Sequence, residues 1–222
     1  MTIALNSDLQ LAVANLLNRT DMSARIPEWI ASAESRMYYG ASEAPYESDP
    51  VRIRSMEQSS YTTINTSSVE LPPAFLQVIR FYISGDSGRK LGYMSPDDFW
   101  DRFIVTTSGR PYAYTIEAEN LLFGPTPDGL YTTQMLYYKA FAPLVNPGDT
   151  NWLLTNAPYI YLHGACLEGF RYLRNFDAAN SSHAAFVGLV NSLNNTSKRD
   201  RFSGPWVSKV DFCTSADSMV PS

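Results

Sequence analysis

The spacing of apolar residues changes twice along this chain, and the change limits the folds open to it. Near both ends, apolar side chains recur at the spacing of amphipathic helices, whereas residues 51–150 are rich in the β-branched and aromatic runs typical of strands. A helix with a narrow apolar stripe is stable only when another element covers that stripe. We therefore expect the helices of the two ends to form one small bundle, with an antiparallel β domain inserted between them. The predicted fold class is α+β.

Two helices are predicted within residues 1–50. Ser7 or Asp8 is suited to cap the first helix, whose apolar residues fall on one face. Those apolar residues are Leu9, Val13, Leu16 and Leu17. Pro27 fits the first turn of the second helix, and Gly40 fits its end. Residues 41–50 contain two prolines and three acidic residues, which predicts a connecting loop.

Strands are predicted through residues 51–150, with one short helix between them. The segments 75–83 and 130–141 are dense in β-branched, aromatic and threonine side chains. The glycine- and proline-rich segment 124–129 predicts a hairpin connection between the strands on either side of it. Ser95, followed by Pro96 and two aspartates, predicts the start of the short helix.

Residues 151–201 return to helical spacing and complete the predicted bundle. Thr155 or Asn156 is suited to cap a helix that runs to about Arg174, and Asp177 is suited to open another. Residues 202–222 contain serine, proline and glycine with scattered aromatic residues. For this last segment we expect an extended C-terminal tail.

Composition excludes several classes of protein. The 222 residues include 22 acidic and 17 basic side chains, a net charge of −5, whereas proteins that grip phosphate backbones usually carry a clustered positive excess. No apolar run approaches the ~18–20 residues of a membrane span, and the first residues lack the basic region of a signal peptide. The two cysteines are too far apart to predict a disulfide framework or a zinc site. We expect no membrane contact, no metal and no cofactor.

Two clusters of side chains are candidates for catalysis. His163 and Cys166 share a predicted helix, but Cys166 has apolar neighbours, among which a buried, unreactive thiol is expected. The acidic cluster of Asp97, Asp98 and Asp101 has the chemistry for glycan hydrolysis or cation binding. At a helix start, however, such residues more simply cap the helix and complement its dipole. We therefore expect no enzyme; a carbohydrate-binding or hydrolytic β domain is the alternative.

The composition is a hint of assembly with other chains; ordinary codon bias together with an aromatic core is the alternative. Arginine supplies 13 of the 17 basic residues, and the chain contains 14 tyrosines and 11 phenylalanines; interface cores are enriched in these types and depleted in lysine. Residues 55–154 carry 6 basic and 10 acidic groups, a charge of −4, whereas residues 155–201 carry 5 and 3, a charge of +2. The candidate contact residues are Arg171, Arg174, Arg199 and Arg201 on the C-terminal helices and Trp206 and Phe212 in the tail.

Several short motifs follow one another along the chain. LNRTDMSARIPEWI occupies residues 17–30, before AESRM at 33–37, and TNWLLTNAPYIYLHGACLE occupies 150–168. Between these helical segments lie LPPAFL at 71–76, YMSP at 93–96 and GRPYAY at 109–114. In this order the motifs resemble the head-to-tail adaptor, or connector, proteins of tailed bacteriophages. The resemblance extends from about Leu9 to Leu193, and the tail after Arg201 lies outside it.

The resemblance implies a structural virion protein without enzymatic activity. Such adaptors form a homo-oligomeric ring, a dodecamer, that docks under the portal protein at the head–tail junction after synthesis in the host bacterial cytoplasm. The ring continues the channel through which double-stranded DNA passes without specific binding, and it offers an attachment surface to tail or nozzle proteins. We expect Arg171 and Arg174 at subunit contacts and the tail from Ser203 on the portal. The alternative is another tail component, a tail tube or tail-completion protein.

Overall fold

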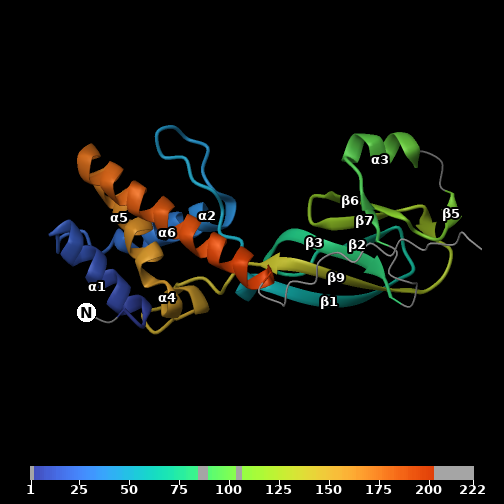
Figure 1. Ribbon diagram of the computed structural model, residues 1–222, viewed down its shortest axis with the longest axis horizontal. Helices are drawn as coiled ribbons and strands as arrows, with labels where there is room; N and C mark the ends of the chain where they lie inside the picture. Colours follow the sequence, from blue (N-terminus) through green and yellow to red (C-terminus); the bar gives the residue numbers. More distant parts are fainter. Residues whose placement is uncertain (1–2, 85–89, 104–106, 203–222) are drawn as a thin grey trace, which may run out of the picture.

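Helices from the two ends of the chain gather in one lobe and strands in another (Figure 1). The structure is a computed structural model that describes residues 3–84, 90–103 and 107–202. We call the two parts the helical lobe and the β lobe, and the chain segments that join them the waist. The predicted α+β class is confirmed, as is the packing of N-terminal on C-terminal helices.

The helical lobe is organised around one central helix. Its elements are α1 (Asn6–Leu17), α2 (Ile26–Tyr39), α4 (Trp152–Asn156), α5 (Pro158–Tyr172) and α6 (Phe176–Phe202). Helix α5 packs against α1, α2 and α6, and the three-way junction is filled by fully buried side chains that include Ile30, Tyr161 and Phe186. Two glycines permit this close packing. A Cβ at Gly164 would lie 2.9 Å from the Cβ of Ala33, and one at Gly169 would lie 2.8 Å from a methyl of Leu17.

The predicted helix ends are partly wrong. Helix α1 starts earlier than expected, at Asn6. Asp8 lies within its first turn, where its carboxylate accepts hydrogen bonds from the backbone N–H groups of Ala4 and Leu5 at 3.1 Å each. Neither Ser7 nor Asp8 is therefore the cap residue. The second helix does end at Gly40, with Pro27 in its first turn, as predicted.

The C-terminal helices also start differently from the prediction. Asn151, rather than Thr155 or Asn156, is a cap: its side-chain oxygen accepts the N–H of Leu154 at 2.9 Å and opens the short helix α4. Pro158, which has no N–H to continue that helix, starts α5, and α5 ends at Tyr172, close to the predicted end at about Arg174. Asp177 lies in the first turn of α6, and this helix continues through the basic residues to Phe202.

The β lobe contains two main sheets and one short strand pair. Its elements are β1 (Glu57–Ile64), β2 (Ser68–Glu70), β3 (Phe75–Ile83), β4 (Gly92–Tyr93), α3 (Pro96–Arg102), β5 (Ser108–Gly109), β6 (Ala113–Glu117), β7 (Asn120–Gly124), β8 (Thr126–Pro127) and β9 (Tyr131–Lys139). Strand orders are β1-β9-β3, β2-β7-β6-β4 and β5-β8. The long pairs are antiparallel, as predicted, whereas β4–β6 and β5–β8 are short parallel pairs. An aromatic core that includes Phe81, Tyr114 and Phe123 lies within this lobe.

The predicted hairpin at residues 124–129 is wrong. Strand β7 pairs with β6 and β2, whereas β9 pairs with β1 and β3, so the segment carries the chain from one sheet to the other. Pro125 and Pro127 lack the N–H groups that a continuing ladder needs, which favours a change of sheet at this point. The observed hairpin joins β6 to β7 through Ala118, which has a positive φ of 51°.

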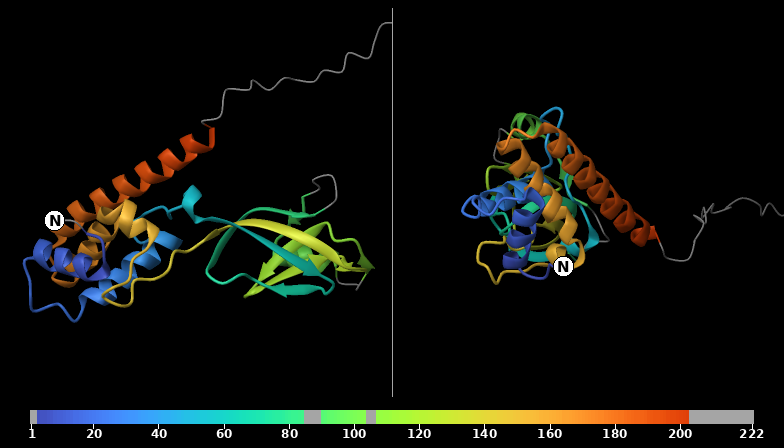
Figure 2. Two further views of the ribbon diagram at one scale, coloured as in Figure 1. Left: turned by 90° about the horizontal axis from the view of Figure 1, so that it is seen from below. Right: turned by 90° about the vertical axis from the view of Figure 1, so that its left-hand side faces the viewer.

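Helix α6 fastens the waist. In Figure 2 it runs past the other helices and alongside the chain that leads into the β lobe. The side chain of Asn194 accepts the N–H of Arg52 at 2.8 Å and donates to the carbonyl of Pro50 at 3.0 Å. Farther along, the hydroxyl of Ser197 accepts the N–H of Arg54, in the 3-10 turn η1 (Arg54–Met56), at 2.8 Å. Within the described ranges, no helix has the length and apolar character needed to cross a membrane.

Candidate functional site

The histidine and cysteine that share a helix are not arranged for catalysis. Cys166 is fully buried in the helical lobe, and this burial raises the pKa of its thiol to about 12. The side chain therefore remains a neutral thiol at physiological pH, when a nucleophile must be a thiolate. Burial also lowers the pKa of His163. Across residues 3–84, 90–103 and 107–202, no group of three or more His, Cys, Asp or Glu side chains is arranged to hold a metal.

The acidic cluster on α3 has a structural role. The hydroxyl of Ser95 accepts the N–H of Asp98 at 3.2 Å, and the carboxylate of Asp98 accepts the hydroxyl proton at 2.6 Å. Ser95 is thus the predicted cap, confirmed by these bonds. Asp97 and Asp101 are exposed on the same short helix. This geometry matches the capping role expected from the sequence.

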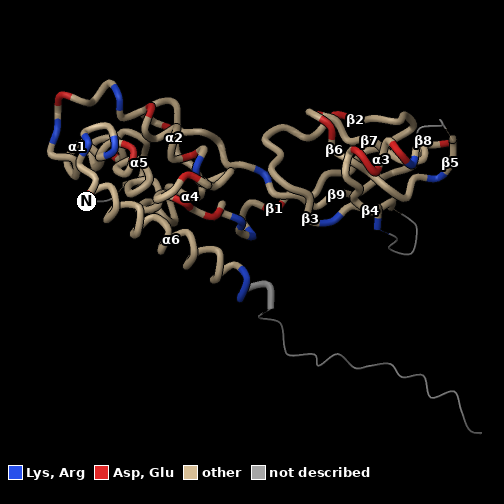
Figure 3. The backbone as a smooth tube through the Cα atoms, turned by 90° about the horizontal axis from the view of Figure 1, so that it is seen from above, with Lys and Arg blue, Asp and Glu red and all other residues tan. Residues whose placement is uncertain are grey.

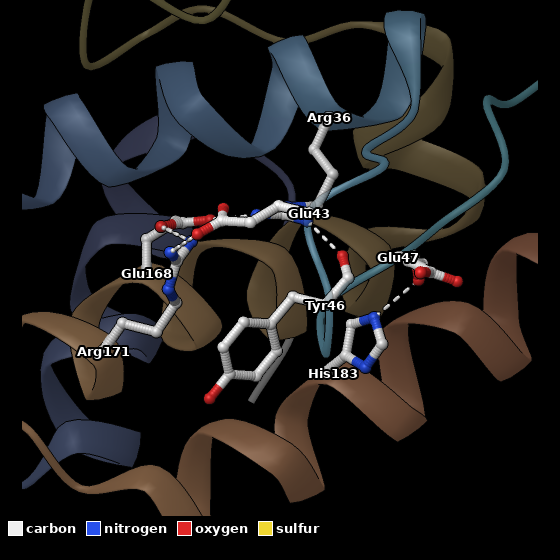
Figure 4. A network of polar contacts seen from close by, with 7 residues as sticks. All are labelled: Arg36, Glu43, Tyr46, Glu47, Glu168, Arg171 and His183. Carbon is white, nitrogen blue, oxygen red and sulfur yellow. Dashed lines mark hydrogen bonds and ion pairs between the residues drawn. The ribbon is translucent and has the colours of Figure 1, made fainter.

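A network of charges, buried at Arg36 and exposed at Glu43, holds the loop of residues 41–49 to the helices (Figure 4). Arg36 on α2, only 8% exposed, donates to the carboxylate of Glu168 on α5 at 2.8 Å and to the carbonyl of Tyr46 at 2.7 Å. The other oxygen of Glu168 accepts from Arg171 at 3.2 Å, and Arg171 in turn reaches Glu43 at 2.9 Å. One carboxylate therefore bridges two arginines, and each arginine also contacts the loop.

The aromatic ring of Tyr46 completes this attachment. It is buried, with the guanidinium of Arg171 5.0 Å from its centre and the ring of His183, on α6, edge-on at 5.5 Å. The Nε2 atom of His183 lies 2.8 Å from the carbonyl of Glu47. The loop is consequently fixed to α2, α5 and α6 together, although it contains no regular helix or strand.

The candidate contact arginines lie in different environments. Arg171 belongs to the internal network and its side chain is 27% exposed, so part of its donor capacity is used within the chain. Arg174 is exposed in the turn after α5, with a positive φ of 56°, and Arg199 is exposed on α6. The side chain of Arg201 and the residues Trp206 and Phe212 lie outside the described residues. Their roles remain predictions.

Glu34 is a second buried polar centre, and the sequence reasoning missed it. Its carboxylate, 8% exposed, accepts the N–H of Leu144 at 3.1 Å and the hydroxyl of Tyr161 at 3.2 Å. Asn151 donates to that same hydroxyl at 2.8 Å. Burial raises the pKa of the Glu34 carboxyl and raises the pKa of the neighbouring Tyr38 to about 12. The sequence did contain a signal for this burial. Glu34 follows Ile30 by four residues, so it lies on the same face of the helix as the apolar stripe.

Two hollows meet at one exposed tyrosine. Tyr39, at the end of α2, is 73% exposed and lines both of them. The loop hollow, of about 610 Å³, is lined by residues 39–42 and 47–50 and by Val187. The waist groove, of about 500 Å³, is lined by Tyr39 together with residues 70–75, Ile116, Ala118 and Glu119. These hollows are open and shallow surfaces rather than enclosed pockets, which suits docking of another protein surface.

Comparison with known protein families gives a match. A family model described as SU10 adaptor protein matches residues 1–209, which include both lobes and the waist. Among functionally curated proteins, none matches the chain.

Proposed function

The chain belongs to the SU10 adaptor protein family of phages, and from this premise we propose that it forms the head-to-tail adaptor ring of a virion. In this role the ring docks beneath the portal, continues the DNA channel and presents an attachment surface for the tail. The observation that carries the proposal is the extent of the family match, residues 1–209, which spans helical lobe, waist and β lobe alike.

The arrangement of chemical groups supports a structural role rather than an enzymatic one. The thiol at Cys166 is buried and protonated, and the aspartates of α3 are placed as helix-capping and exposed groups. The buried ionic groups Glu34 and Arg36 instead hold segments of the chain to one another. Such networks make a rigid unit with a fixed shape, which is what a ring subunit needs.

Charge supports passage of DNA without tight binding. In a dodecamer, which is the expected stoichiometry, the net charge is 12 × (−5), or about −60. A channel wall with this sign of charge repels phosphates and displaces no counterions from the DNA, so double-stranded DNA slides past without binding tightly. We place the acidic β lobe, with its excess of four negative charges over residues 55–154, nearer the channel than the basic end of α6.

The segment after α6 is our candidate for the portal contact. Trp206 and Phe212 are large apolar residues in a stretch rich in serine and proline, and aromatic side chains commonly anchor protein interfaces. Arg171, Arg174, Arg199 and Arg201 are candidates for contacts with the portal or with neighbouring subunits, since arginine tolerates partial desolvation.

Removing this segment tests the portal contact. The purified chain and a variant lacking residues 203–222 should have the same helical content and the same unfolding transition, but only the full chain should bind purified portal. A matched variant, Trp206→Ala with Phe212→Ala, should reproduce the loss. Undiminished portal binding by both variants would sink the assignment of this segment. Failure of the full chain to bind portal, together with binding to tail tube, would favour the alternative of a tail component.

A further inference from the structure

The face that carries Tyr39 is acidic and hollowed. Glu47 and Asp49 line the loop hollow, and Glu70 and Glu119 line the waist groove on the other side of Tyr39. All four carboxylates are exposed, and within the described residues none of them forms an ion pair. Pro72 and Pro73 add apolar surface between the acids. This face therefore combines an aromatic anchor, concave shape and unpaired negative charge.

The C-terminal end of α6 carries unpaired positive charge. Lys198 and Arg199, near the end of α6, are exposed and form no ion pair within the described part of the chain. Arg54, also exposed, is held next to them because its N–H is bonded to Ser197. In Figure 3, α6 and its blue end lie along one side of the molecule, and the red segments beside β2 and β6 lie along the other.

The exposed face of α6 also carries a row of small side chains. Ala184, Gly188 and Ser192 follow one another at four-residue intervals, and all three are exposed. The glycines of α5 are explained by neighbours that a Cβ would strike, whereas a Cβ at Gly188 would meet nothing within 4 Å. A glycine inside a helix is less favourable than alanine unless something packs closely on it. Among the described residues of one copy, none packs on Gly188 in this way.

We propose that the exposed face of α6 and its basic end, on one copy, dock against the acidic face around Tyr39 on the next copy. The helix carries Arg54, Lys198 and Arg199 toward Glu70 and Glu119, and Tyr39 packs against the helix. Because the two surfaces are different patches of one subunit, the contact is head-to-tail, the type that closes into a ring when the rotation fits. Opposite charges at such a contact steer association and set its register. The inference rests on the proposed ring and adds which surfaces meet.

Charge reversal in two separate variants tests the contact. Lys198→Glu with Arg199→Glu makes both surfaces acidic, and Glu70→Lys with Glu119→Lys makes both basic. Each variant alone should need a concentration higher by about ten-fold or more to assemble, because like charges then face each other. An equimolar mixture should regain wild-type assembly, since every contact in an alternating ring again joins opposite charges. Mass photometry, with and without portal, gives the readout.

Two further variants separate this contact from general charge effects and from misfolding. Asp97→Lys with Asp101→Lys raises the net charge as much as Glu70→Lys with Glu119→Lys does, but on α3, and should assemble like wild type. Gly188→Trp should block assembly while leaving the helical content unchanged, since the isolated subunit has room for the side chain.

The outcomes distinguish the contact from the ring itself. Rings that form equally well in both charge-reversed variants would overturn the contact while leaving the adaptor ring in place. A mixture that assembles no better than its components would overturn it as well. If the wild-type chain stays monomeric even on the portal, both the contact and the ring are contradicted.

Discussion

The two lobes of this protein are stabilised in different ways. The helical lobe joins segments more than a hundred residues apart in sequence, and it does so with buried ionic groups: Arg36 to Glu168, and Glu34 to the return chain at Leu144. Within the described residues, the buried polar side chains of the β lobe are uncharged threonines, Thr115 and Thr133, in an aromatic core. The difference indicates that charged networks hold remote segments of the helical lobe together. In the β lobe, backbone hydrogen bonds between strands and aromatic packing are sufficient.

The largest effect should follow from breaking the network at Arg36. Arg36→Met leaves the buried carboxylate of Glu168 with Arg171 alone and frees the loop carbonyl of Tyr46, and removal of one partner of a buried pair costs about 3–5 kcal/mol. Urea unfolding followed by circular dichroism measures this loss. The control is Arg80→Met on β3, an exposed site, with a change within about 0.5 kcal/mol. If both substitutions changed the free energy of unfolding by the same small amount, the proposed difference between the two lobes would be contradicted.

A smaller effect is expected from filling the space at a helix crossing. Gly164→Ala places a methyl 2.9 Å from the Cβ of Ala33 and 3.3 Å from the ring of Phe186, so overpacking should cost about 1–3 kcal/mol. Adding Ala33→Gly should recover much of that loss. In the isolated subunit, Gly188→Ala should instead stabilise by about 0.5–1 kcal/mol, because its site is open. Thermal unfolding of the three variants gives the comparison, and a stabilising Gly164→Ala would contradict the close packing of α5.

The smallest and most specific effect concerns pH. Burial raises the pKa of Glu34 in the folded chain above that of an unfolded glutamate, whose ordinary value is 4.5. The contribution of this group to stability is therefore fully present below that ordinary value and is lost as pH rises through the folded pKa. Glu34→Gln cannot titrate, so wild type should lose stability relative to Glu34→Gln as pH increases. Urea unfolding of both proteins, from below pH 4.5 to above the raised pKa of Glu34, measures the difference in their stability. A difference that stays constant, or that changes in the opposite direction, would contradict the prediction.

The sequence predicted the outline of this fold because the outline depends on local patterns. The Ser95 cap and the stop at Gly40 require only residues close in sequence, and both are confirmed. The predicted stripe of the first helix is confirmed at Leu9, Val13 and Leu17, whereas Leu16 is 46% exposed. The hairpin at residues 124–129 failed because strand pairing depends on which sheet offers a free edge, and turn residues alone do not specify that.

The polar networks could not be predicted from the sequence, because they too depend on which elements meet in space. Glu168 bridges Arg36 and Arg171 only because α2 and α5 pack side by side, and charge patterns along one helix do not reveal that meeting. Arg171 was selected as a contact residue from its type alone, whereas its position adds two intrachain partners. Tyr39 was not singled out, because its exposure between two hollows depends on how the loop folds back.

The position of the protein in the virion tests the account most directly. Electron microscopy of intact particles, with the two lobes of Figure 1 fitted to the density, locates the chain relative to portal and tail. We predict a ring of this subunit between portal and tail, with α6 of each copy against the Tyr39 face of the next. Subunits stacked along the tail tube, or no copy at the junction, would contradict it.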